Sequence, residues 1–123
     1  GVNEPTVDSE ISEIYQTLQL SDCFVASSGN YRNYYQLDKR IISHTINPKT
    51  GFPERNNILS TTVICNRGAY ADAWATAGMV IGWPYFFDLS ERNPDIEAYI
   101  IYSDENGMLK DTATSGAEVF LLP

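Results

Sequence analysis

Histidine and cysteine are scarce in this chain, which limits the metal and nucleophilic chemistry that it can carry. The 123 residues include one histidine, His44, and two cysteines, Cys23 and Cys65. Neither cysteine lies in a Cys-x-x-Cys or a Cys/His pattern, which argues against a structural zinc site. Both stand in apolar segments, CFVAS and TVICN, so we expect buried free thiols, with a disulfide between them as the alternative.

Positive charge is also in short supply. Eight lysines and arginines against sixteen acidic residues give a formal net charge of −8. A nucleic-acid partner is therefore not expected, because binding to a phosphate backbone needs a basic face. A protein of this charge that handles phosphates would need a cation to offset its own negative field.

Long hydrophobic runs are missing as well. No apolar run approaches the roughly 20 residues that a membrane-spanning helix needs. Apolar residues nevertheless make up 43% of the chain and charged residues 20%, which is typical of a folded domain. The length suits one domain with a core and is too short for two. We therefore predict a single domain over residues 1–123.

Hydrophobic patterning predicts an α+β fold, with a mostly antiparallel sheet and packed helices. Apolar residues at helical spacing predict helices over residues 6–19, 68–82 and 85–92. Short β-branched and apolar runs predict strands over residues 23–28, 59–66, 96–103 and 118–122. Two further apolar runs flank Asp38 and Lys39, which indicates a hairpin.

A candidate metal site lies in the segment ADAWAT. Asp72 and Thr76 are four residues apart in a predicted helix, so their side chains share one face. One carboxylate and one hydroxyl form half of a hard-oxygen site for Mg²⁺, which leaves other positions for water or phosphate. The alternative is a solvated aspartate and a threonine bonded to its own helix backbone. Spacing alone leaves both interpretations open.

The segment SHTINPKTGFP contains a shaped loop that begins after His44. Pro48 fixes its own φ and Gly51 can take a positive φ, so the sequence predicts a tight turn. A histidine titrates near neutral pH and can act as an acid or a base. A lone histidine on a strand can equally be a hydrogen-bonded structural residue.

A third segment, SSGNYRNYY, is a candidate anion site. We expect a tight turn at Ser28, Gly29 and Asn30, whose N–H groups and hydroxyl can bind an anion. The alternative is an ordinary turn followed by strand tyrosines that pack on their neighbours.

Together, the segments SSGNYRNYY, HTINPKTGFP and ADAWATAGMVIG resemble the FAD:protein FMN transferase family, also called ApbE. They occur in the family's order and at about its spacing. The resemblance runs from about Ser27 to Gly82 and continues more weakly to Leu122. It implies that the chain is the C-terminal portion of an ApbE-like, T-fold-like domain.

The resemblance implies an enzyme that uses Mg²⁺ to transfer FMN from FAD to a Thr or Ser hydroxyl of a target protein, with release of AMP. A divalent ion that bridges phosphate oxygens would neutralise their charge during this transfer. FAD would be the substrate and a flavin-acceptor protein the partner. Two alternatives stay open: a flavin- or nucleotide-binding module without catalysis, and a pyrophosphatase that splits FAD into FMN and AMP.

The resemblance also assigns roles to individual residues. Asp72 and Thr76 match the family's metal ligands. His44 matches a histidine near the transferred phosphate, which would orient or deprotonate the incoming hydroxyl. The remaining candidates are expected to contact the nucleotide, and they are Ile46, Thr50, Gly51, Ser28 and Gly29.

Two features depart from the family pattern. Asn47 stands where aspartate is more common, which removes a negative charge, although asparagine can form the same Asx turn before Pro48. The chain is also much shorter than the family's domain. Most of the flavin contacts and a further metal ligand are therefore expected in N-terminal segments outside it.

Members of the family usually work on the outer face of the bacterial cytoplasmic membrane, in the periplasm, often as lipoproteins. The resemblance implies this location for the parent protein, with the lipid anchor upstream of the chain. An exported location would also permit a disulfide between Cys23 and Cys65.

We predict that this chain alone has little or no transferase activity. A half-site with one carboxylate binds Mg²⁺ weakly, and the expected flavin contacts lie elsewhere. The measurement is the release of AMP from FAD in the presence of Mg²⁺, with the full-length protein as the positive control. Robust turnover by the chain alone would contradict the prediction.

Overall fold

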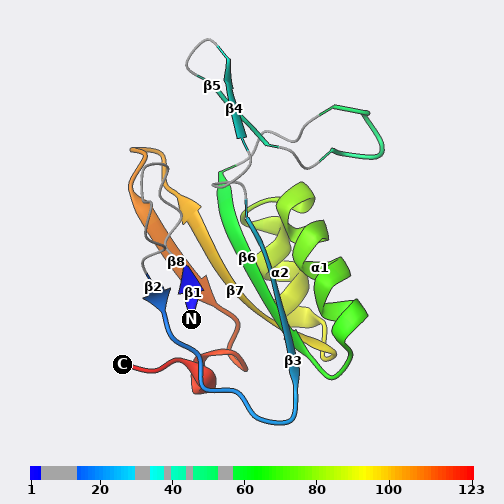
Figure 1. Cartoon of the computed structure of the whole chain (residues 1–123), viewed down its shortest axis with the longest axis vertical. Helices are drawn as coiled ribbons and strands as arrows, with labels where there is room; N and C mark the ends of the chain where they lie inside the picture. Colours follow the sequence, from blue (N-terminus) through cyan, green and yellow to red (C-terminus); the bar gives the residue numbers. More distant parts are fainter. Residues whose placement is uncertain (4–13, 30–33, 38–39, 44–45, 53–56) are drawn as a thin grey trace.

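An antiparallel sheet with the strand order β3-β6-β7-β8 forms the centre of the described chain (Figure 1). The computed structural model describes residues 1–3, 14–29, 34–37, 40–43, 46–52 and 57–123. The sheet strands are β3 (Phe24–Gly29), β6 (Ile58–Cys65), β7 (Ile96–Ser103) and β8 (Leu109–Ala113). The two central strands, β6 and β7, are rich in β-branched residues, which suit a strand packed on both faces.

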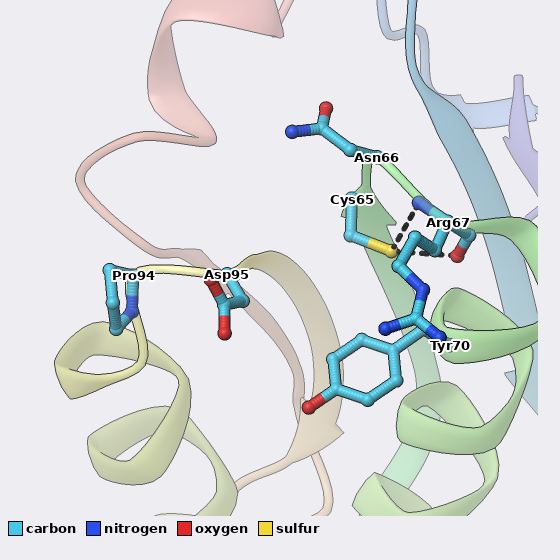
Figure 2. A pocket seen from close by; sticks show the side chains of 6 residues that line it. All are labelled: Cys65, Asn66, Arg67, Tyr70, Pro94 and Asp95. Carbon is cyan, nitrogen blue, oxygen red and sulfur yellow. Dashed lines mark hydrogen bonds between the residues drawn. The ribbon is translucent and has the colours of Figure 1, made fainter.

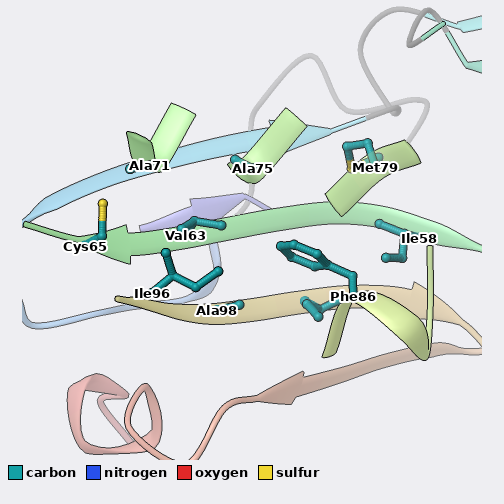
Figure 3. Close-up of a cluster of buried hydrophobic side chains, with 10 residues drawn as sticks. Ile58, Val63, Cys65, Ala71, Ala75, Met79, Phe86, Ile96 and Ala98 are labelled. Atoms are coloured by element: carbon teal, nitrogen blue, oxygen red, sulfur yellow. The ribbon is translucent and has the colours of Figure 1, made fainter. Parts of the chain in front are cut away.

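Two helices, α1 (Gly68–Ile81) and α2 (Tyr85–Arg92), cover one face of this sheet. Side chains of β6 and β7 alternate between the two faces, as a strand requires. The buried alanines Ala71 and Ala75 let α1 approach the sheet closely. Figure 3 shows the resulting core between helices and sheet, and its buried members are Ile58, Val63, Cys65, Ala71, Ala75, Met79, Phe86, Ile96, Ala98 and Ile100.

The opposite face of the sheet is covered by the two ends of the chain. Strands β1 (Val2–Asn3) and β2 (Ile14–Gln16) pair with each other, and Val2 packs in a second core with Tyr99 and Ile101. The Tyr99 hydroxyl donates a 2.6 Å hydrogen bond to the Asp111 carboxylate. Burial, together with this bond, raises the pKa of Tyr99 above its usual value, so the phenol stays protonated.

A long connection joins β3 to β6 at one end of the sheet. It contains the hairpin of β4 (Tyr34–Leu37) and β5 (Arg40–Ser43). Gly29 pairs with Ser60, so the connection leaves and re-enters the sheet at neighbouring points. Figure 1 shows the hairpin and the following loop projecting from this end.

The predicted α+β class with a mostly antiparallel sheet is confirmed. The helices predicted over residues 68–82 and 85–92 and the strands predicted over 23–28, 59–66 and 96–103 are present within a residue or two of the expected bounds. The hairpin is also confirmed. Cys65 is buried, Cys23 is half-buried, and both thiols are free. Neither described helix has the length and hydropathy that a membrane span requires.

Two predicted elements are wrong. The helix expected over residues 6–19 is an extended segment where it is described, because Ile14–Gln16 pairs with β1 and Leu18 bridges to Leu121; residues 6–13 lie outside the described chain. The apolar residues there pack on the second core instead of forming one helical face. The strand expected over residues 118–122 is a short 3₁₀ helix, Glu118–Phe120, followed by that bridge.

Strand β8 was not predicted. Its central residues are Lys110, Asp111 and Thr112, a polar run that lacks the hydrophobic alternation of a half-buried strand. It forms because it adds an edge to β7, with which it pairs from Tyr99 to Ser103. Only its inward-facing side chains need to be apolar at such an edge.

We predict that Gly78→Ala lowers the free energy of unfolding by about 1–3 kcal/mol, because a methyl group there overpacks the core. An added Cβ at Gly78 would lie 2.6 Å from an atom of the Phe86 ring. The sign of the change in unfolding free energy tests this cause, because a Gly→Ala change at an exposed position inside a helix stabilises by about 1 kcal/mol. Chemical denaturation measures the change.

The control is a double-mutant cycle with Phe86→Leu. The smaller side chain makes room for the methyl group, so Gly78→Ala should cost less in that background than in the native one. Equal costs in both backgrounds would show that the contact with Phe86 is not the cause.

Candidate functional site

A buried hydrogen bond fixes helix α1 on the sheet at the point where the candidate site begins. The Thr61 hydroxyl of β6 donates to the backbone carbonyl of Ala75 at 2.5 Å, and both residues are fully buried. A buried hydroxyl needs such a partner, because leaving it unpaired costs about 1–3 kcal/mol. The bond therefore fixes the position of the α1 turn that carries Thr76 relative to β6.

Asp72 and Thr76 lie one turn apart on α1, and both are exposed. The Thr76 hydroxyl donates to the backbone carbonyl of Asp72 at 3.1 Å, which is the local bond expected of a threonine within a helix. Among the described residues, the Asp72 carboxylate has no hydrogen-bond or ion-pair partner. The threonine is therefore bonded to the helix backbone as expected. This bond uses the hydroxyl hydrogen of Thr76 and leaves its oxygen lone pairs and the Asp72 carboxylate available to a ligand.

Ser28 joins this pair from the neighbouring strand. Its hydroxyl oxygen lies 3.3 Å from the hydroxyl oxygen of Thr76. The preceding residue, Ser27, points to the opposite face of the sheet, where its hydroxyl lies 2.7 Å from that of Thr62. The structure thus brings together one carboxylate and two hydroxyls, from Asp72, Thr76 and Ser28.

The turn expected at Ser28, Gly29 and Asn30 is wrong for the two residues that the structure describes. Ser28 and Gly29 belong to β3, where they pair with Thr61 and Ser60 of β6, and Asn30 lies outside the described residues. The strand continues through Gly29 because the β6 ladder extends that far. Their expected role in binding an anion stays a prediction, and any contribution from Ser28 would come from its side chain.

The loop around Asn47 has the predicted shape. The Asn47 side-chain oxygen accepts a hydrogen bond from the Lys49 N–H at 2.9 Å, which is the expected Asx turn. The Asn47 carbonyl accepts bonds from the N–H groups of Thr50 (3.3 Å) and Gly51 (2.8 Å). Gly51 has a φ of 73°, which is the conformation that favours glycine.

The loop around Asn47 presents exposed apolar side chains. Ile46 is 51% exposed and Phe52 72% exposed. Within the described ranges, no hydrogen bond joins Ile46, Thr50 or Gly51 to the hydroxyl and carboxylate groups on α1 and β3. His44 lies outside the described residues, so its expected role stays a prediction.

The donor set fits Mg²⁺ better than other common metals. Carboxylate and hydroxyl oxygens are hard ligands, and Mg²⁺ is usually held by one or two carboxylates together with water and substrate phosphates. In the described part of the chain, no three His, Cys, Asp or Glu side chains gather in one place. Such a site is open and incomplete, so a phosphate ligand would have to supply further oxygens.

A pocket that sequence reasoning missed lies at the start of α1 (Figure 2). It encloses about 290 Å³ and is lined by Cys65, Asn66, Arg67, Tyr70, Pro94 and Asp95. The Arg67 guanidinium stands 5.4 Å from the centre of the Tyr70 ring, and the Cys65 thiol bonds to the Arg67 carbonyl. None of the predicted site residues lines it, so it is separate from the candidate metal site.

Comparison with known proteins gives consistent matches. A family model described as "ApbE family" matches residues 1–100. The FAD:protein FMN transferase of Escherichia coli K12 is 41% identical over 82 residues, which are 67% of this chain and 23% of that protein. The enzyme of the same name from Vibrio cholerae is 33% identical over 121 residues, which are 98% of this chain and 35% of that protein.

Solved structures give the same picture. The structure titled flavin transferase ApbE from Vibrio cholerae superposes with a TM-score of 0.76 at 34% identity, covering 98% of this chain and 36% of that one. The ApbE protein of Thermotoga maritima also gives a TM-score of 0.76, at 26% identity, covering 100% of this chain and 38% of that one. The matched part of the chain spans 23% to 38% of the length of these relatives.

We predict that Asn47→Ala lowers the free energy of unfolding by about 0.5–1.5 kcal/mol, because the Lys49 N–H loses its acceptor in the turn. Asn47→Asp keeps an acceptor oxygen at the same position and should remain within about 0.5 kcal/mol of the native chain. Urea denaturation of the three proteins measures the differences. Equal loss in both variants would contradict the role of the Asx turn.

Proposed function

Because this chain belongs to the ApbE family, we propose that it is the C-terminal part of an enzyme that transfers FMN from FAD to a protein. The acceptor is a Thr or Ser hydroxyl of a flavin-dependent redox protein, and the second product is AMP. The relatives of known name support this activity, since each of them is called a FAD:protein FMN transferase or flavin transferase.

In the proposed reaction the acceptor hydroxyl attacks the phosphorus atom of the FMN half of FAD. A new P–O bond forms to the acceptor, the P–O bond to the AMP phosphate breaks, and the hydroxyl proton passes to a base. When bound, Mg²⁺ would supply positive charge to the pyrophosphate oxygens as negative charge builds up on them. The net charge of −8 makes this neutralisation necessary.

The observation that carries the proposal is the grouping of Asp72 and Thr76 on one exposed face of α1. These side chains would hold the metal, Asp72 through its exposed carboxylate and Thr76 through its hydroxyl oxygen. The bond from Thr61 to the Ala75 carbonyl fixes the intervening backbone, so the two ligands keep their spacing before the metal binds. Such preorganisation limits the free energy lost in ordering ligands.

The loop residues would contact the nucleotide through particular atoms. The N–H groups of Thr50 and Gly51 are already engaged by the Asn47 carbonyl, so they are not free donors for a phosphate. Among the described residues, apart from Gly51 and its two chain neighbours, no atom lies within 4 Å of a Cβ built at Gly51. A flat group can therefore lie against the backbone at Gly51.

His44 is proposed to take the proton of the acceptor hydroxyl, a role assigned by the family motif alone. By the same resemblance we propose an exported protein on the outer face of the bacterial cytoplasmic membrane, held by a lipid anchor upstream of this chain.

We predict that Asp72→Ala in the full-length protein lowers metal-dependent cleavage of FAD at least about 100-fold, since removal of the carboxylate loses several kcal/mol of charge stabilisation. AMP release measures cleavage, and mass spectrometry of an acceptor protein measures attachment of FMN. The matched control is Asp88→Ala, which removes an exposed carboxylate from α2.

Three results would separate the candidate functions. Loss of both AMP and acceptor mass in Asp72→Ala alone supports the transferase. AMP release by the native protein without any gain in acceptor mass would favour a pyrophosphatase. Flavin binding without AMP release in the native protein would favour a binding module.

A further inference from the structure

We infer that Ser28 is a positioning residue for the proposed metal site, where its hydroxyl fixes the hydroxyl of Thr76 in the orientation that leaves one lone pair for the cation. This inference rests on the proposed function, because it concerns the ligands of the same site. Ser28 acts through Thr76 and is not itself placed on the metal.

The hydrogen-bond pattern of Thr76 sets the direction of the bond to Ser28. A hydroxyl group has one hydrogen and two lone pairs. The hydrogen of Thr76 is donated to the Asp72 carbonyl at 3.1 Å, so the 3.3 Å contact with Ser28 is a bond that Ser28 donates. One lone pair of Thr76 is thereby occupied, and the other stays available to a metal ion.

The two bonds together stop the hydroxyl from rotating. With the backbone bond alone, water would compete for both lone pairs of Thr76, because the residue is exposed. With Ser28 in place, one lone pair is held by the protein. Partners that orient a metal ligand in this way typically change metal affinity by 10–100-fold.

The fold places Ser28 where it can do this. Ser28 pairs with Thr61 in the ladder between β3 and β6, and Thr61 donates to the Ala75 carbonyl. Neighbouring positions of two paired strands therefore hold two consecutive residues of α1, one by its backbone and the other by its side chain. The bond from Thr61 fixes the backbone of α1 relative to the sheet, and the bond from Ser28 fixes the orientation of the Thr76 hydroxyl.

Strand geometry also supplies a matched control. Ser27 precedes Ser28 on the same edge strand and carries the same hydroxyl, but it points to the opposite face and lies 2.7 Å from Thr62. A general weakening of β3 would follow from the loss of either serine, whereas an effect on the metal ligand would follow only from the loss of Ser28.

The test uses Mn²⁺ as the probe and the full-length protein as the binder, with electron paramagnetic resonance of the free ion to measure the dissociation constant. Ser28→Ala is expected to weaken Mn²⁺ binding about 10-fold. Ser27→Ala and Ser28→Thr, which keeps a hydroxyl, are expected to bind as the native chain does. Ser28→Ala and Ser28→Thr should melt close to the native protein, whereas Ser27→Ala should melt at a lower temperature because the buried Thr62 hydroxyl loses its bond to Ser27.

The outcomes separate this inference from the function on which it rests. Unchanged Mn²⁺ binding in Ser28→Ala, or equal weakening in Ser27→Ala, would overturn the positioning role and leave the metal site intact. No binding by the native full-length protein, or equal binding by its Asp72→Asn variant, would overturn the metal site and the inference with it. If Ser28→Ala does not fold, Ser28→Cys preserves the volume with a weaker donor, and native affinity in that variant would count against the inference.

Discussion

The contact of α1 with the paired strands β3 and β6 is the interaction on which the rest of this structure depends. Alanines let the helix lie close to the sheet, and the Thr61 hydroxyl fixes its backbone at Ala75. The exposed side of the same helix carries Asp72 and Thr76. Core packing and site geometry therefore depend on each other, because a shift of α1 that disturbed the core would also move Asp72 and Thr76 relative to β3.

The sequence predicted the central elements well because their local preferences agree with their burial. β6 is rich in β-branched residues and β7 in apolar ones, and α1 is a run rich in small residues that suits a close-packed helix. The errors fall at the ends of the chain, where pairing partners decide the structure. Ile14–Gln16 is extended because β1 lies beside it, and no local pattern records that partner.

The candidate site was predictable in part for a similar reason. Spacing along one helix brings Asp72 and Thr76 to one face, which is local information. The nearness of Ser28 to Thr76 arises from strand register over 48 residues of separation, and the segment motif pointed instead to a turn. The family resemblance supplied the chemistry, and the fold supplied the hydrogen-bond pattern that connects these residues.

The connection between β3 and β6 leaves the sheet at Gly29 and returns beside it at Ile58. Because its two ends are held together by the ladder, the entropy needed to close it changes only slowly with its length. Insertions, deletions or exchanged residues there need not disturb the layers below. The connection can thus change in length while the helix that presents the Asp72 carboxylate stays as it is.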